Sequence, residues 1–98
     1  MSPTVSILGV KAKVARSLFA RMKGLIGTKR LPPGEGLLIP HCNAIHTCFM
    51  SFPIDAVFLD RHDRPVKTVR NIRPWRLFVW GGFRAAKVLE TAAAASMV

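Results

Sequence analysis

The chain has 98 residues, half of them hydrophobic, with seven prolines and seven glycines spread along it. A chain of this length holds one modest hydrophobic core, so we expect a single globular domain over residues 1–98, and a disordered, repeat or low-complexity protein is excluded. Lys and Arg outnumber Asp and Glu by 15 to 5, giving a formal net charge of +10. This excess favours polyanions and anionic membrane surfaces, although a basic surface also keeps a small apolar protein in solution.

The amino-terminal residues do not have the pattern of a secretory signal, because no basic region precedes the apolar residues of 1–10. No apolar run approaches the roughly twenty residues that a membrane span requires. The two cysteines, Cys42 and Cys48, are too few for a disulfide framework and are compatible with a reducing compartment. We therefore expect a cytoplasmic protein with no membrane span.

The first expected elements are a strand over residues 4–10 and a helix over residues 12–26. In the second segment apolar residues recur at helical spacing with basic residues opposite, and Gly24 and Gly27 end the pattern. A basic amphipathic helix can lie on an anionic membrane, but a stripe of this width more often packs on a sheet, which is the interpretation we favour. The proline-rich segment 31–36 is expected to be a loop.

Short apolar or β-branched segments separated by turn formers follow the loop, and they are expected to be strands at 37–39, 44–50, 54–60, 66–72 and 85–90. This spacing is typical of a sandwich or a barrel. The predicted fold is therefore mainly β, with one short amphipathic helix near the amino terminus. The alanine-rich residues 92–95 fit either a final helical turn or a tail, and the sequence does not decide between them.

A long motif occupies the centre of the chain: Cys42-x-x-Ile45-His46-Thr47-x-x-Met50-x-Phe52-x-Ile54-Asp55-x-Val57-Phe58-Leu59-Asp60. It resembles the core signature of the bacterial and archaeal domain of unknown function family 192, also called the uncharacterised ACR family. Other positions agree in order: Arg16, Gly24-Leu25, Leu31, Gly36-Leu37-Leu38, Pro74-Trp75-Arg76 and Val88-Leu89-Glu90. The resemblance extends from about residue 15 to residue 90. It implies a compact, jelly-roll-like β fold with one short helix, and it implies no activity, because the family has no established function.

The chain departs from the family pattern after Glu90. Where the family usually continues with Leu-Pro-Ala-Gly and a further strand, Thr91 and four alanines follow here. The resemblance therefore implies that the closing strand is missing. An open sheet edge of this kind would favour self-association.

Four possible metal ligands occur in the central segment. If residues 44–50 are a strand, alternate side chains lie on one face, which groups Cys42, His46, Cys48 and Met50. Thiolate, imidazole and thioether suit copper(I) or zinc, but one extended strand cannot surround an ion, so a bend after Pro40 or a ligand from another strand would be required. The interpretation we favour is that Cys48 and Met50 are ordinary buried residues, with His46 hydrogen-bonded nearby.

Asp55 lies in a predicted strand that is apolar on both faces, so its carboxylate needs a partner. We favour a structural role, with the carboxylate bound to backbone amides or to a buried arginine. The alternative is an enzyme in which His46 works with Asp55 or with Cys48 as nucleophile. His46 and Asp55 share a face only if the loop of a hairpin joining their strands has an even number of residues or a bulge.

The function that the sequence favours is a non-enzymatic small-ligand or metal-binding β domain. Its site would be a concave pocket lined by His46, Met50, Asp55 and Trp75. No residue pattern for phosphoryl transfer or for a serine hydrolase supports either of those activities.

The alternative function is weak, sequence-indifferent nucleic-acid binding. It depends on a basic zone with one cation every three residues, comprising Arg61, Arg64, Lys67, Arg70, Arg73 and Arg76, together with the rings of Trp75, Phe78 and Trp80. In proteins that bind single-stranded nucleic acid, cations contact the phosphate backbone and aromatic rings stack on the bases. A spacing of three on a strand divides the charges between both faces, which suits a rim, and we expect the tryptophans to lie in the core or in a pocket wall.

Overall fold

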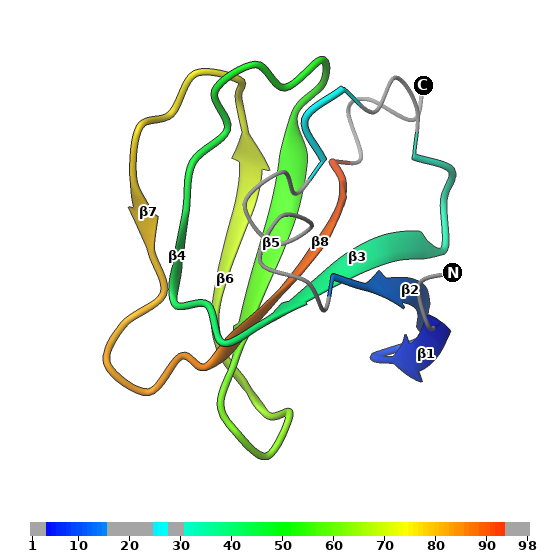
Figure 1. Cartoon of the computed structure of the whole chain (residues 1–98), viewed down its shortest axis with the longest axis vertical. Coiled ribbons are helices and arrows are strands. Elements are labelled where there is room, and N and C mark those ends of the chain that lie inside the picture. Colours follow the sequence, from blue (N-terminus) through cyan, green and yellow to red (C-terminus); the bar gives the residue numbers. More distant parts are fainter. Residues whose placement is uncertain (1–3, 16–24, 28–30, 94–98) are drawn as a thin grey trace.

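The computed structural model describes residues 4–15, 25–27 and 31–93, and within them the chain forms strands and turns without a helix (Figure 1). The strands are β1 (Thr4–Ile7), β2 (Val10–Val14), β3 (Glu35–Pro40), β4 (Ala44–Ile45), β5 (Ile54–Leu59), β6 (Pro65–Ile72), β7 (Val79–Trp80) and β8 (Lys87–Ala92). The mainly β prediction is confirmed. No helix that could cross a membrane occurs in these residues.

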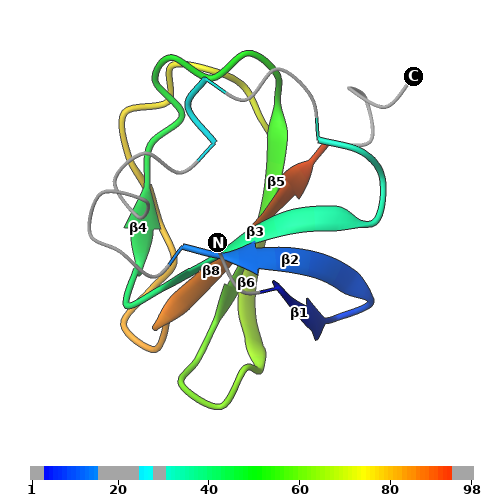
Figure 2. The ribbon, with the colours of Figure 1, turned by 45° about the vertical axis from the view of Figure 1, so that its right-hand side comes forward.

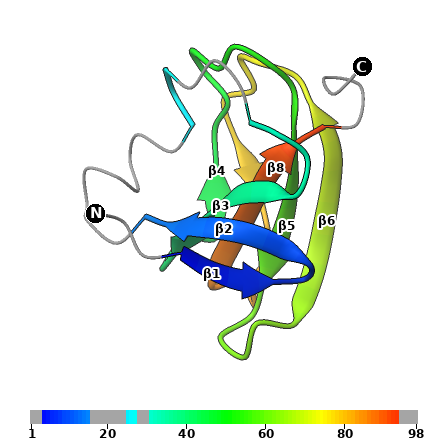
Figure 3. The ribbon, with the colours of Figure 1, turned by 90° about the vertical axis from the view of Figure 1, so that its right-hand side faces the viewer.

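Six strands form one mixed sheet in the order β1-β2-β3-β8-β5-β6, in which only β2 and β3 are parallel neighbours. The chain's last strand, β8, therefore lies in the middle, between β3 and β5 (Figure 2). Strands β4 and β7 pair as a separate two-stranded ribbon, on the far side of the molecule from β1 (Figures 1 and 3). Because β1 and β6 end the six-stranded sheet as edges, the expected barrel is not closed.

The helix predicted over residues 12–26 is wrong at its start. Ala12 and Val14 belong to β2, where they are buried and pair with β3, while Lys11 and Lys13 are exposed. Buried and exposed side chains alternate with the period of two that a strand requires. Over so few residues this alternation also fits the first turn of the helical pattern. Residues 16–24 lie outside the described residues, and residues 25–27 form a turn.

Four of the remaining strand predictions are confirmed, and two are corrected by the structure. The strands expected at 37–39, 54–60, 66–72 and 85–90 are confirmed as β3, β5, β6 and β8, within two residues at either end. The strand expected over 44–50 ends at Ile45, and the hairpin considered between it and 54–60 is not formed, because β4 pairs with β7. A turn at Leu8 and Gly9, both with positive φ, divides the strand expected over 4–10 into β1 and β2.

Apolar side chains cover both faces of the sheet. The two adjoining residues Val88 and Leu89 of β8 point to opposite faces and belong to different core clusters. The larger cluster surrounds Phe58, which is completely buried. The smaller cluster contains Ala12, Val14, Leu38, Leu59 and Leu89. Burial on both faces explains why the sequences of the central strands are nearly continuous runs of apolar residues.

One charged side chain is buried in the middle of this sheet. Glu90 of β8 is 4% exposed, and its neighbours across the sheet are Leu37 of β3 and Ala56 of β5. Within the described residues its carboxyl group makes no hydrogen bond and no ion pair. Burial raises the pKa of Glu90 to about 7, because the charged form is poorly solvated there.

Candidate functional site

Thr47 joins two loops that are far apart in the sequence. It lies in the loop after β4 and is 1% exposed. Its backbone N–H donates to the Arg76 carbonyl oxygen at 2.9 Å, and its carbonyl oxygen accepts from the Trp75 N–H at 2.9 Å. Its hydroxyl donates to the Arg73 carbonyl oxygen at 2.6 Å and accepts from the Arg76 N–H at 2.9 Å. These bonds end β4, because the chain after Ile45 pairs with the 73–76 turn and not with a strand.

Replacing Thr47 by valine is expected to lower the free energy of unfolding by about 2 kcal/mol. The substitution keeps the shape of the side chain but leaves the part-buried Arg76 N–H and Arg73 carbonyl oxygen without their hydroxyl partner. Urea unfolding measures the loss. Thr47→Ser retains the hydroxyl and is the matched control, with an expected loss of about 1 kcal/mol from the missing methyl group. No loss of stability in Thr47→Val would show that the hydroxyl contributes nothing.

The joined loops turn two aromatic rings outward. Phe49 and Trp75 both have positive φ, are 65% and 60% exposed, and meet edge to face with ring centroids 4.6 Å apart. A second edge-to-face pair lies around the end of β7, where the rings of Trp80 and Phe83 have centroids 4.7 Å apart. Phe83 is 95% exposed. The prediction that both tryptophans lie in the core or in a pocket wall is therefore wrong.

Cations accompany these rings. All six cations of the predicted basic zone are exposed, and they lie along edge strand β6 and in the connections at its two ends. Arg84, which the prediction did not include, is also exposed. Residues 64–89 contain seven Lys or Arg and no Asp or Glu. We call the exposed residues of this part of the molecule the aromatic-basic surface: Phe49, Lys67, Arg73, Trp75, Arg76, Phe78, Trp80, Phe83 and Arg84.

The nearest acids in the sequence, Asp60 and Asp63, have partners of their own, in the β5–β6 turn for Asp60 and on β8 for Asp63. Asp60 Oδ1 accepts hydrogen bonds from the backbone N–H groups of Arg64, at 3.0 Å, and His62, at 2.8 Å. The hydrogen bond from the Arg64 N–H is the largest of the influences that lower the pKa of Asp60. Asp63 forms an ion pair with Lys87. These carboxylates therefore stabilise the turn in their charged form.

The ligand set predicted for copper or zinc is not assembled as expected. Since β4 ends before His46, Cys42, His46, Cys48 and Met50 do not share a strand face. Met50 is buried in the core while His46 is exposed. The Cys42 thiol donates to the Ala44 carbonyl oxygen at 3.1 Å, and His46 Nδ1 accepts from the Cys48 N–H at 3.2 Å. Nowhere in residues 4–15, 25–27 and 31–93 do three His, Cys, Asp or Glu residues come together as a metal site.

Asp55 holds a bulge in β6. Ile54 pairs with Ile72 and Ala56 pairs with Val69, so one residue of β5 faces two of β6. The extra residue places Asn71 at a φ of 52°. Asp55 Oδ1 accepts from the Asn71 N–H at 2.8 Å, which satisfies a donor that the interrupted ladder leaves without a strand partner. The favoured interpretation, a carboxylate bound to a backbone amide, is confirmed.

The residues of the predicted pocket, His46, Met50, Asp55 and Trp75, lie on different elements and differ in exposure. Asp55 belongs to the six-stranded sheet, whereas His46 follows β4 of the ribbon. Met50 is 8% exposed and faces the core, whereas Trp75 points outward. His46 and Asp55 consequently share no sheet face. Their assignment to one ligand site, and the enzyme that pairs them, have no geometric support.

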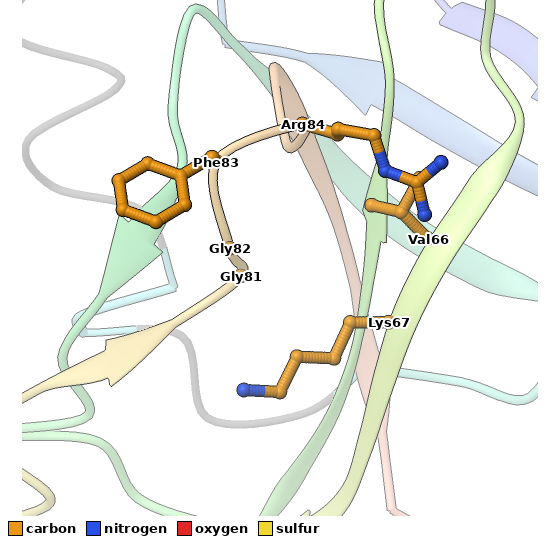
Figure 4. A pocket seen from close by; sticks show the side chains of 6 residues that line it. All are labelled: Val66, Lys67, Gly81, Gly82, Phe83 and Arg84. Atoms are coloured by element: carbon orange, nitrogen blue, oxygen red, sulfur yellow. The ribbon is translucent and has the colours of Figure 1, made fainter.

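Two open hollows lie on either side of Phe83 and Arg84. The first has a volume of about 360 Å³ and is also lined by Val66, Lys67, Gly81 and Gly82 (Figure 4). The second has a volume of about 400 Å³ and is also lined by Asp60, Arg61, His62, Ala85 and Ala86. Both hollows are bounded by exposed cations, so a ligand that enters either one meets positive charge.

Comparison with known proteins identifies the family. The model of the domain of unknown function family 192, described as Uncharacterized ACR, matches residues 3–96. The chain belongs to this family. A UPF0127 protein of Thermococcus sibiricus (strain DSM 12597 / MM 739) is 35% identical to this chain over 85 residues, which make up 83% of this chain and 54% of the relative. The chain thus spans about half the length of that curated protein.

Two solved structures have the same fold. A protein of unknown function from Novosphingobium aromaticivorans DSM 12444 gives a TM-score of 0.78 at 20% identity, covering 95% of this chain and 73% of that one. A putative transcription regulator from Sinorhizobium meliloti 1021 gives a TM-score of 0.79 at 19% identity, covering 86% and 69%. At these identities the likeness shows the fold alone. The resemblance seen in the sequence is confirmed, and family 192 brings no established activity.

Proposed function

We propose that the aromatic-basic surface binds single-stranded nucleic acid, weakly and without sequence preference. The observation that carries the proposal is the exposure of rings and cations in one acid-free stretch, residues 64–89: Trp75, Phe78 and Phe83 are 60%, 65% and 95% exposed, and Arg73, Arg76 and Arg84 are exposed as well. An exposed cluster of large apolar side chains usually marks an interaction site. Rings stack on bases and cations neutralise the phosphates between them.

The small-ligand and metal-binding functions have less support. The residues expected to form their site are divided between the core, a bulge and the surface, and the two hollows are wide open to solvent. A nucleic-acid function is also consistent with a cytoplasmic location and with the formal charge of +10.

The test is fluorescence anisotropy with a labelled oligothymidine of about 12 nucleotides, a length suited to one small domain. We expect binding at low salt that weakens as salt is added, with a log–log slope of about −0.7 for each phosphate contacted. Phe83→Ala is expected to weaken binding about tenfold or more, because stacking contributes about 1–3 kcal/mol per base. Leu77→Ala is the matched control: Leu77 is 81% exposed and equally apolar but has no ring.

Absence of binding at low salt would overturn the proposal, because the phosphate contribution is strongest there. Equal weakening by Phe83→Ala and Leu77→Ala would also contradict it, since ring stacking would then contribute nothing. Binding to phosphatidylglycerol vesicles without binding to the oligonucleotide would assign the surface to a membrane instead.

A further inference from the structure

The turn that follows β7 presents a row of backbone donors. It is closed on one side by the Gly81 N–H, which donates to the Asn43 carbonyl oxygen at 2.7 Å, and on the other by the Ala85 N–H, which donates to the Gly82 carbonyl oxygen at 3.2 Å. Between them, the N–H groups of Gly82, Phe83 and Arg84 donate to no acceptor in the described part of the chain. Consecutive free N–H groups in a turn are a common feature of anion-binding sites.

Two cations line the hollow beside this turn, one from β6 and one from the turn itself. Lys67 extends from β6 towards the turn, and its ammonium group donates to the Trp80 carbonyl oxygen at 2.7 Å (Figure 4). This bond fixes the position of the ammonium group and leaves two of its three protons for a ligand. The Arg84 side chain extends over β6 beside Val66 (Figure 4). The hollow between them is lined without a carboxylate.

An aromatic pair adjoins this hollow. Trp80 ends β7 immediately before the turn, and its ring meets that of Phe83 edge to face. The ring of Phe83 points away from Lys67 and Arg84 (Figure 4) and is 95% exposed. A ligand with a phosphate group in the hollow and a planar ring beyond the turn would contact both the cations of the hollow and the ring of Phe83.

We propose that the hollow bounded by Lys67, Gly82 and Arg84 binds a phosphate group of a nucleotide, whose base stacks on the ring of Phe83. The ammonium group, the guanidinium group and the turn N–H groups supply the charge and the donors that phosphate oxygens require. The assignment to a nucleotide rests on the function proposed above, because that function supplies the base. The assignment to phosphate rests on the donors and cations alone.

Two-dimensional amide NMR of the full chain tests the site with inorganic phosphate and with thymidine 5′-monophosphate. We expect both ligands to shift the amide signals of Gly82, Phe83 and Arg84, and the nucleotide to bind about fivefold or more tightly than phosphate because of stacking. Lys67→Gln and Arg84→Gln are each expected to weaken phosphate binding about tenfold, since each removes a charge-assisted hydrogen bond.

Lys13→Gln is the matched control, because Lys13 is an exposed cation on β2, at the opposite edge region of the sheet. It removes the same charge and is expected to change phosphate binding less than twofold by long-range electrostatics alone. Equal effects of Lys13→Gln, Lys67→Gln and Arg84→Gln would overturn the phosphate site, even if oligothymidine still binds elsewhere on the surface.

The remaining outcomes separate the two proposals. Shifts at the turn with phosphate, but no binding of oligothymidine, would retain the phosphate site and overturn the nucleic-acid function. Equal affinities for phosphate and thymidine 5′-monophosphate, with binding to phosphatidylglycerol vesicles that is lost in Lys67→Gln, would overturn the nucleotide and assign the phosphate to a lipid headgroup.

Discussion

Replacing Gly81 by alanine is expected to lower the free energy of unfolding by about 3 kcal/mol, at the upper end of the usual cost of overpacking a core. An added Cβ would lie 2.2 Å from Cδ1 and 2.4 Å from Cγ of Phe58, and 2.8 Å from Cβ of Ala85. Phe58 is completely buried and cannot swing aside. Urea or thermal unfolding measures the loss.

A second glycine provides the control for this prediction. Gly9 has a φ of 76° and an added Cβ there would meet nothing within 4 Å, so Gly9→Ala should cost only about 1 kcal/mol of backbone strain. Gly81→Ala should also cost less in a Phe58→Leu background, where the ring is gone. An unchanged cost in that background would show that the contact with Phe58 is not responsible.

Stability is expected to fall as the pH rises from about 4.5 to about 7, through the titration of Glu90. The pKa of this carboxyl group is about 7 in the folded chain and 4.5 as its ordinary value, so the folded state holds a proton that the unfolded state releases. The contribution is fully present below pH 4.5 and is lost as the pH passes 7. Since one pKa unit corresponds to about 1.4 kcal/mol, the loss is on the order of 3 kcal/mol.

Glu90→Gln isolates this titration, because glutamine stays neutral at every pH. The variant should be more stable than the parent chain at about pH 8, and that advantage should shrink as the pH is lowered to about 5. Glu35→Gln is the control, since Glu35 is an exposed carboxylate on β3. A difference between Glu90→Gln and the parent chain that is the same at both pH values would refute the assignment.

Much of the sheet could be predicted from the sequence because its strands are short, apolar and bounded by turn formers. The strands β5, β6 and β8 follow this pattern and are found within two residues of their expected bounds. Asp55 was equally predictable: a carboxylate in an apolar strand needs a partner, and it has the Asn71 N–H. In each case the decisive interaction is local or acts between strands that the pattern already identifies.

The errors arise where a distant segment determines the local structure. Thr47 ends β4 by bonding to residues 73–76, which no pattern within residues 44–50 reveals. The same bonds turn Trp75 outward, against the usual tendency of tryptophan to be buried. Phe83 and Arg84 were missed, although the absence of acids from residues 64–89 and the Gly81-Gly82 pair were visible signals of an exposed basic turn.

The position of β8 also determines when the sheet can form during synthesis. Residues 87–92 supply the only strand that hydrogen-bonds to both β3 and β5 within the described sheet. Before residues 87–92 have been translated, no strand joins β1–β3 to β5–β6. The apolar strands β3 and β5 each then have an edge without its partner. The complete sheet can therefore form only after β8 has been translated, and the unpaired strand edges are open to aggregation until then.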